Sequence, residues 1–294
     1  MKIGITGASG MLGTALVANL SKTYEVFATS RSQGIKGKNI KWNCFDITNR
    51  ALLVRWLNKC KPDIVIHCAA IINIDACEHD IDLATKVHIK ATDTLVEYLN
   101  NNNGRLIYIS TDSVFDGKKQ TPYSEADIPN PINIYAKTKL MGEKPVRLMH
   151  KGLILRTNII GQIQGERSSF FEWILQSLIN KEPLNLFYDV YFSPITVYDL
   201  SSLVRKIIEE PIFGLYHCGS NDGISKYDFG MKVAKIFKLS NLNINKVSIN
   251  SMNFKAKRPK NMSLNIKKIS SDMDYEFPSV VDVIETMKRQ YSDK

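Results

Sequence analysis

A phenol and an amine stand at a spacing that could move a proton to or from a carbonyl oxygen. Tyr135 and Lys139 are four residues apart in IYAKTKLMGE, which we expect to be helical, so they share one helical face while Lys137 points away. Thr111 follows the apolar run RLIYIS and precedes Tyr135 by 24 residues. A phenol of ordinary pKa, about 10, is a poor acid–base catalyst at neutral pH, and a neighbouring ammonium would lower that pKa. By itself, a tyrosine four residues before a lysine is common in helices, and such a pair usually has only a structural role.

Three glycines follow the first apolar run, KIGIT, in the segment TGASGMLG that opens the next helix. One glycine of such a loop makes the strand-to-helix turn, a second lets the backbone approach a pyrophosphate, and a third allows close helix–sheet packing. A plain tight turn also uses glycine, but the position between a buried strand and a helix favours dinucleotide binding. With this loop in register, the tyrosine and lysine become a strong signal of catalysis. The predicted contacts here are Gly7, Ser9, Gly10, Met11, Leu12 and Gly13.

The end of the second predicted strand, ATSRS, indicates which dinucleotide would bind. An NAD site usually offers a carboxylate to the ribose 2′-hydroxyl there, and no acidic residue lies between Glu25 and Asp46. Arg31 is present instead and suits a 2′-phosphate, although it could also be simply exposed. We therefore expect NADPH, with NADH possible.

Strands and helices that alternate along the chain would position these residues. Apolar strands are predicted at 2–6, 25–30, 40–45, 63–69, 105–110 and 153–158, with helices at 11–20, 50–59, 82–100 and around Tyr135. This alternation predicts an α/β fold: a Rossmann-like, doubly wound parallel sheet covered on both faces. We expect residues 1–160 to form the dinucleotide-binding domain, to which about 190–220 return.

Residues 161–294 are expected to form mainly a smaller C-terminal α/β lobe that binds the substrate. Its predicted elements are a helix over 169–180, a loop with Pro183 and Pro194, a helix from Asp199, the strand GLYHCG, a helix over 225–238 and a last helix after Pro278.

The composition is that of an ordinary soluble globular protein, with 294 residues, 44% hydrophobic and 23% charged. The apolar stretch DIVIHCAAIINID is short for a membrane helix and is interrupted by His67. No signal peptide is evident, the five cysteines lack C-x-x-C spacing, and the histidines form no metal-ligand cluster. We expect a cytoplasmic protein without a bound metal or a membrane partner.

The net charge of +10 is concentrated between Phe229 and Ser271, where ten basic residues and no acidic one occur. Most of these lysines would lie on a solvated surface. Nucleic-acid binding is disfavoured because aromatics for base stacking are not interleaved with them. A third interpretation is a cleft that attracts a pyrophosphate, since a patch of one sign concentrates anions.

The G-x-x-G-x-x-G loop, the strand-end hydroxyl and Tyr-x-x-x-Lys together resemble the extended short-chain dehydrogenase/reductase superfamily. This resemblance implies that Asp46 and Ile47 bracket the adenine and that Cys68, Ala69 and Ala70 line the nicotinamide side. It also assigns Ser110, Tyr135 and Lys139 to the cofactor. Members of this superfamily often form homodimers.

A narrower resemblance covers nearly the whole chain. STDSVFDG, YAKTKLMGE, ILRTNIIG, SPITVYDL, GLYHCG and KRPKNMSLN follow one another as in dTDP-4-dehydrorhamnose reductases and related sugar-nucleotide reductases. The resemblance implies NADPH-dependent reduction of a nucleotide-linked 4-keto-6-deoxy sugar, in deoxysugar or polysaccharide biosynthesis. Hydride would go to C4, Tyr135 would donate the proton, Thr111 would orient the carbonyl, and Lys139 would hold the ribose. The implied substrate contacts are Asn73, Asp112, Val114 and Arg258.

Three departures from the family bear on which sugar is bound. His88 stands where the family usually has an asparagine, as a polar link or as packing; Ile71 replaces a tyrosine; and DVYFSPIT lacks a glutamine and a glycine. Other functions stay open. A sugar-nucleotide epimerase or dehydratase shares the fold, but dehydratases tend to have an acidic pair where Asp112 is followed by Ser113. A non-catalytic, NADP-binding regulatory subunit resembling that of methionine adenosyltransferase is the other alternative.

Overall fold

Parallel strands form the main sheet of the computed structural model, which describes residues 1–163, 168–240 and 243–292. The strand order is β10-β6-β5-β4-β1-β2-β3, and β9 pairs with the end of β6. The strands are β1 (Lys2–Thr6), β2 (Glu25–Ser30), β3 (Ile40–Cys44), β4 (Ile64–His67), β5 (Arg105–Thr111), β6 (Gly152–Ile160), β9 (Pro194–Thr196) and β10 (Gly214–Cys218). Because the order reverses between β1 and β4, a crevice is expected at their carboxyl ends, where nucleotides bind in such sheets.

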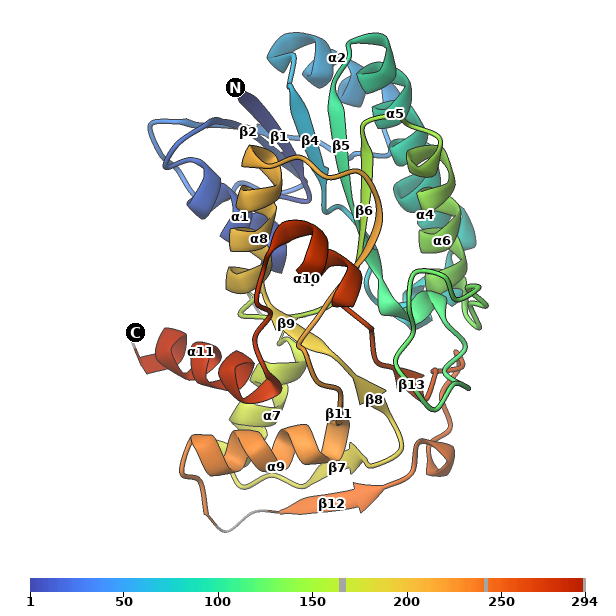
Figure 1. Ribbon diagram of the computed structural model, residues 1–294, viewed down its shortest axis with the longest axis vertical. Helices are drawn as coiled ribbons and strands as arrows, with labels where there is room; N and C mark the ends of the chain where they lie inside the picture. The colour runs from blue at the N-terminus through green and yellow to red at the C-terminus, as the bar shows by residue number, and fades with distance from the viewer. Residues whose placement is uncertain (164–167, 241–242, 293–294) are drawn as a thin grey trace.

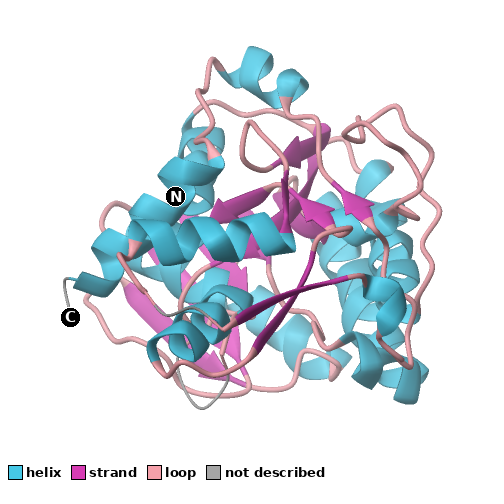
Figure 2. Ribbon diagram, turned by 90° about the horizontal axis from the view of Figure 1, so that it is seen from below, coloured by secondary structure: helices cyan, strands magenta, loops and turns pink. Residues whose placement is uncertain are grey.

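Helices cover both faces of this sheet, as Figures 1 and 2 show. One apolar layer joins the sheet to α1 (Met11–Leu20), α8 (Val197–Glu209) and α10 (Lys267–Met273). The opposite layer joins it to α2 (Arg50–Cys60), α5 (Ala91–Asn101) and α6 (Ile134–Arg147). The predicted doubly wound, Rossmann-like α/β fold is confirmed. Of the described helices, none is both long and apolar enough to cross a lipid bilayer.

A separate apolar core holds the C-terminal lobe together, around aromatic residues such as Phe171, Phe192 and Phe229. Its helices are α7 (Phe170–Ile179), α9 (Lys226–Ile236) and α11 (Val280–Ser292), and its strands are β7 (Leu184–Phe187), β8 (Tyr191–Phe192), β11 (Ile224–Ser225), β12 (Ile244–Val247) and β13 (Asn261–Met262). In Figure 1 this lobe lies below the main sheet. The chain returns from it to the sheet through β9, α8 and β10. The division into two domains at residue 160 stays a prediction.

The long helix predicted over 82–100 is interrupted. It consists of α4 (Ile81–Thr85), a π-helical turn (Lys86–Lys90) and α5, and the short helix α3 (Ile74–His79) precedes it. The wide π turn pushes its backbone against α6, where a Cβ at Gly142 would lie 2.3 Å from the carbonyl oxygen of His88. Only glycine permits this approach. Hydrophobic periodicity cannot reveal a single added residue per turn, so the sequence predicted one continuous helix.

The loop predicted around Pro183 and Pro194 is also wrong in part. Residues 184–187 and 191–192 are strands, and Pro194 begins β9. Strands of two to four residues are too short to display an alternating pattern, and proline is tolerated at the first residue of a strand because its missing N–H is not needed there.

A fully buried ion pair fixes α6 on the main sheet. Glu143 of α6 accepts hydrogen bonds from Arg156 of β6 at 2.9 and 2.7 Å and from the Ser110 hydroxyl of β5 at 2.6 Å. Both charged side chains have no exposed surface. A buried charge must be paired, so these donors restrict where α6 can pack.

We expect Glu143→Gln to lower the free energy of unfolding by about 3–5 kcal/mol, because it leaves the Arg156 charge buried without a counter-charge. Urea denaturation at neutral pH measures this loss. The matched control is Glu97→Gln, which breaks the exposed ion pair with Arg50 and should cost about 1 kcal/mol or less. Equal small losses for both variants would contradict the role given to Glu143.

Candidate active site

The glycine turn between β1 and α1 brings bare backbone to the crevice of the main sheet. Gly7 has a φ of 64°, and a Cβ there would lie 2.6 Å from the backbone nitrogen of Ala69. A Cβ at Gly13 would lie 2.3 Å from the Gly7 carbonyl oxygen, so α1 packs directly on the turn. Gly10 is the N-cap of α1, whose first turn carries no acidic residue. The helix N-terminus, with Ser9, Met11 and Leu12 around it, is therefore suited to an anion.

The predicted adenine and nicotinamide contacts flank this turn. Arg31 is exposed at the end of β2. Burial acts to raise the pKa of Asp46, but hydrogen bonds from Thr48 and the charge of Arg31 outweigh it and hold that pKa below its usual value. Cys68 follows β4 beside Ala69, and burial raises the pKa of its thiol to about 12. Ala70 and Ile47 are likewise partly exposed near the same edge.

Contacts from three segments fix the first turn of α6, which carries Tyr135. The Asn133 side chain accepts a hydrogen bond from the backbone of Ala136 at 2.9 Å and donates one to the carbonyl of Lys257 at 3.0 Å. The carboxylate of Glu78, from α3, accepts a hydrogen bond from the backbone N–H of Ile134 at 2.8 Å. Tyr135 therefore has a position set by both lobes.

Lys139 is buried one turn after Tyr135. Its ammonium donates a hydrogen bond to the carbonyl oxygen of Ile109 at 2.7 Å and lies 4.1 Å from the centre of the Tyr108 ring. Burial lowers the pKa of Lys139 to about 8, and the carboxylate of Glu143 acts against this loss. The side chain is therefore mainly cationic at neutral pH. Lys137 is exposed, as the helical spacing predicts.

The pKa of Tyr135 is shifted in the direction opposite to the one that the sequence predicted. Burial raises it to about 12; a hydrogen bond with Thr111 opposes this rise, and the charge of Asp112 adds to it. In the protein without cofactor, the loss of water around the phenol thus outweighs any lowering of the Tyr135 pKa by Lys139. At neutral pH the phenol keeps its proton, which is the form that a proton donor needs.

The end of β5 presents a hydroxyl and a carboxyl group to the same region. Thr111 accepts a hydrogen bond from the backbone N–H of Ser113 at 3.1 Å and donates one to Asp112 at 3.2 Å. The side-chain amide of Asn158, on β6, donates to the other oxygen of Asp112 at 2.6 Å. Burial raises the pKa of Asp112. Ser110, predicted at the cofactor, directs its hydroxyl to Glu143 instead.

His88 forms a polar link, which resolves the two interpretations of its presence. Its Nε2 accepts a hydrogen bond from the backbone N–H of Ile71 at 2.9 Å, so Nδ1 carries the proton and donates to the Thr138 hydroxyl at 2.8 Å. The ring meets the Tyr135 ring edge-on at 5.8 Å. Burial, aided by the charge of Lys139, lowers the pKa of His88 to about 2. The residue is a neutral connector between the loop after β4 and α6.

The residues predicted to contact the substrate lie in different surroundings. The Val114 side chain is fully buried with Phe115, so it has no surface left for a substrate. Asn73 is exposed and uses its side-chain oxygen to cap α3. Arg258 pairs with Asp75 of the same helix at 3.0 Å. If Arg258 contacts a substrate, as predicted, its guanidinium has to bind the substrate while it also pairs with the carboxylate of Asp75.

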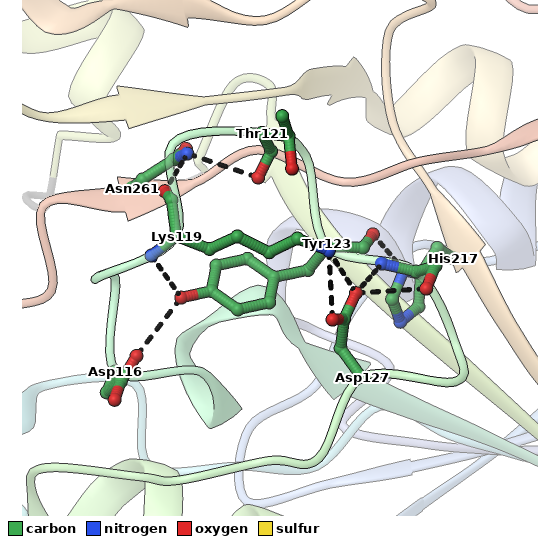
Figure 3. Close-up of polar contacts among 8 residues, drawn as sticks. Asp116, Lys119, Thr121, Tyr123, Asp127, His217 and Asn261 are labelled. Atoms are coloured by element: carbon green, nitrogen blue, oxygen red, sulfur yellow. Dashed lines mark hydrogen bonds and ion pairs between the residues drawn. The ribbon is translucent and has the colours of Figure 1, made fainter.

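A hydrogen-bonded loop between β5 and α6 ties the two lobes together (Figure 3). The Tyr123 phenol accepts from the backbone of Lys119 and donates to Asp116, both at 3.1 Å. The Asn261 side chain donates to the Lys119 carbonyl at 2.7 Å, and the buried His217 of β10 meets the Tyr123 carbonyl at 3.0 Å. The C-terminal lobe is thereby held beside Thr111 and Asp112.

Two hollows have different surroundings. One of about 410 Å³ lies at the amino ends of the central strands, lined by residues such as Lys61, Tyr98 and Arg105, away from the proposed catalytic groups. The other, of about 300 Å³, lies in the C-terminal lobe and is lined by Phe170, Trp173, Pro183, Asn185, Leu186, Phe187, Lys226, Met252 and Phe254. We regard the second as relevant to the site, because Lys226 acts electrostatically on Asp112.

Sequence reasoning missed several residues of this site. Glu143 stands four residues after Lys139 within the quoted helix, so helical spacing could have revealed it. Asn158 lies in the quoted ILRTNIIG, but nothing local shows that it reaches Asp112. Glu78 and Lys226 come from distant segments, and their roles arise only from tertiary packing.

Comparisons with known proteins show which proteins this chain resembles. The family described as RmlD substrate binding domain matches residues 1–292. A dTDP-4-dehydrorhamnose reductase of Aggregatibacter actinomycetemcomitans is 30% identical over 280 residues, 90% of each chain. Methionine adenosyltransferase 2 subunit beta of Rattus norvegicus is 29% identical over 282 residues, 92% of this chain and 82% of that protein. The crystal structure of dTDP-4-dehydrorhamnose reductase from Bacillus anthracis, in complex with NADP, has a TM-score of 0.84 at 26% identity and covers 98% of this chain and 99% of its own.

Three buried histidines, His67, His88 and His217, have pKa values lowered by burial. Because the unfolded chain takes up their protons below about pH 6.5, stability should fall as pH decreases from about 6.5 to 5. In His88→Leu the dependence of the unfolding free energy on pH should become less steep, by the amount that corresponds to about one proton. Urea denaturation at several pH values measures this dependence. The variant should also lose about 1–3 kcal/mol at pH 8, because the Ile71 N–H stays unpaired. The control His79→Leu changes an exposed residue and should do neither; an unchanged slope in His88→Leu would contradict the neutral connector.

Proposed function

The chain belongs to the family described as RmlD substrate binding domain, and on this basis we propose that it is an NADPH-dependent reductase of a nucleotide-linked 4-keto-6-deoxy sugar. Such a reaction serves deoxysugar or polysaccharide biosynthesis. Residues 1–160 would bind mainly the dinucleotide, and residues 161–294 mainly the sugar nucleotide. The cytoplasmic location and the homodimer stay predictions.

The surroundings of the glycine turn fit a nicotinamide dinucleotide. Any Cβ at Gly7 would clash with the backbone of Ala69, so the glycine keeps the turn close to the loop after β4. The N-terminus of α1 lacks a competing carboxylate in its first turn. When bound, NADPH would supply the hydride to C4 of the sugar. Arg31 would meet the 2′-phosphate, and Cys68 and Ala69 would lie on the nicotinamide side.

The observation that carries the proposal is the convergence of Thr111, Tyr135 and Lys139 at the carboxyl end of β5. Burial raises the pKa of Tyr135 to about 12, so the phenol is protonated and can give its proton to the carbonyl oxygen as that oxygen gains electrons. The Thr111 hydroxyl would orient the oxygen. Lys139 would hold the nicotinamide ribose, and its charge would stabilise the phenolate that remains.

The regulatory-subunit alternative has a specific observation in its favour, because the beta subunit of methionine adenosyltransferase 2 resembles this chain about as closely as the reductase does. A purely binding role would use Tyr135 and Lys139 to hold NADPH and would need no proton transfer. The effect of removing the phenol oxygen therefore separates the two functions.

We expect Tyr135→Phe to lower the rate of NADPH oxidation on an accepted sugar nucleotide by about 10²–10⁴-fold, because the proton donor is lost while ring packing is kept. Folding and NADPH binding should survive. Lys139→Met should also weaken NADPH binding, and the exposed Lys137→Met should be nearly silent. Single-turnover NADPH oxidation measures all three variants. Wild-type activity in Tyr135→Phe would reject the mechanism and favour the regulatory subunit.

We expect the wild type to bind NADPH more tightly than NADH. Arg31→Ala should weaken NADPH binding by about tenfold and leave NADH binding within about twofold, since the lost charge faces only the 2′-phosphate. Cofactor fluorescence titration gives both constants. The assignment of Arg31 is wrong if the wild type prefers NADH or if the variant keeps its NADPH affinity.

A further inference from the structure

The amino group of Lys226 has aromatic rather than anionic neighbours. This lysine is the first residue of α9, where Ser225 caps the helix and Val190 accepts the Lys226 backbone N–H at 2.9 Å. Its ammonium lies 3.3 Å from the centre of the Phe192 ring and 4.0 Å from that of Phe170. Within the described ranges, no oxygen pairs with this ammonium in a hydrogen bond or an ion pair. In the part of the chain that the structure describes, no contacting carboxylate thus neutralises this basic group.

Lys226 is linked by packing to the segment that follows Thr111. Phe192, whose ring contacts the Lys226 amino group, pairs with Met262 of β13, and the sulfur of Met262 accepts a hydrogen bond from the Ser113 hydroxyl at 3.8 Å. Burial lowers the pKa of Lys226 to about 7, and the carboxyl group of Asp112 acts against this. A bound anion would favour the charged form of the amine. Asp112 follows Thr111 directly, and its carboxyl group forms no ion pair with Lys226.

On its other side, Lys226 lines the aromatic hollow of the C-terminal lobe. The hollow has a volume of about 300 Å³, and its side chains include Phe170, Trp173, Phe187 and Phe254. Trp173 and Phe254 are among the more exposed large apolar residues of the described chain. Planar groups stack on such rings. The hollow suits a nucleobase, and among the described residues that line it the basic one is Lys226.

The aromatic hollow and Lys226 thus belong to the lobe that contacts the segment after Thr111. We propose that Lys226 binds the diphosphate of the substrate, with the base in the aromatic hollow and the keto sugar at Thr111. This inference rests on the proposed function, because it takes a nucleotide-linked sugar as the substrate.

Other basic residues nearby are less suited to this role. Arg258 pairs with Asp75, and Lys260 lies 3.1 Å from Asp189. Lys226, by contrast, is held between two rings, so little side-chain freedom is lost when an anion binds. An ammonium in a site with little water also interacts more strongly with phosphate oxygens than an exposed one.

Isothermal titration with nucleoside diphosphates and with the matching nucleosides tests the inference. The titrants are dTDP, UDP, GDP and CDP, compared with thymidine, uridine, guanosine and cytidine. Lys226→Met keeps the length of the side chain and its contacts with the rings but removes the charge. It should raise the Kd of the preferred diphosphate by about tenfold or more and leave the nucleoside and NADPH within about twofold.

Lys226→Arg should bind the diphosphate within about threefold of the wild type, because it keeps the charge. Lys232→Met, exposed on the same helix, should match the wild type. On an accepted substrate, Lys226→Met should raise KM far more than it lowers kcat, the signature of lost uniform binding.

Equal weakening of diphosphate and nucleoside in Lys226→Met would mean lost packing and would overturn the inference. Unchanged diphosphate affinity would overturn it as well. Both results leave the proposed reductase intact. If the wild type binds no nucleoside diphosphate while it still binds NADPH, the substrate class itself is wrong and both proposals fall.

Discussion

The buried carboxylate of Glu143 is the interaction on which the arrangement of the proposed catalytic groups depends. Arg156 and Ser110 donate to it from two neighbouring strands, and a charge without water tolerates little displacement of its donors. One helical turn away, the same carboxylate supports the ammonium of Lys139 against burial. A single anion therefore both sets the position of α6 and preserves the cation that the helix carries.

The other half of the site depends on contacts of loops, some of which connect the two lobes. The start of α6 bonds to Lys257 and Glu78. Tyr123 contacts Asp116 and His217, and Asn261 of β13 donates to the carbonyl of Lys119. The bond from Asn133 to Lys257 and the bond from Asn261 to Lys119 each join segments more than one hundred residues apart. The sheet positions the groups that would react, and loops on top of it shape the space that would select the sugar nucleotide.

Local sequence predicted the fold and the positions of the glycine turn, Thr111, Tyr135 and Lys139, because each depends on neighbours within a few residues. Features set by distant contacts could not be predicted in this way. The π turn at Lys86–Lys90 packs against Gly142 of another helix. Arg258 forms an ion pair with Asp75, and the side chain of Val114 is buried in the core. The pKa of Tyr135 was misjudged for the same reason, since the degree of burial is a tertiary property.

The environment of Cys68 has a consequence for how the protein withstands chemical stress. Its thiol lies beside the expected nicotinamide position, and burial raises its pKa to about 12. Only the thiolate reacts readily with peroxides and alkylating agents. The crevice thus contains a sulfur atom that is almost never in its reactive form at physiological pH. The protein can therefore keep a cysteine beside the expected cofactor without presenting a reactive thiolate at that place.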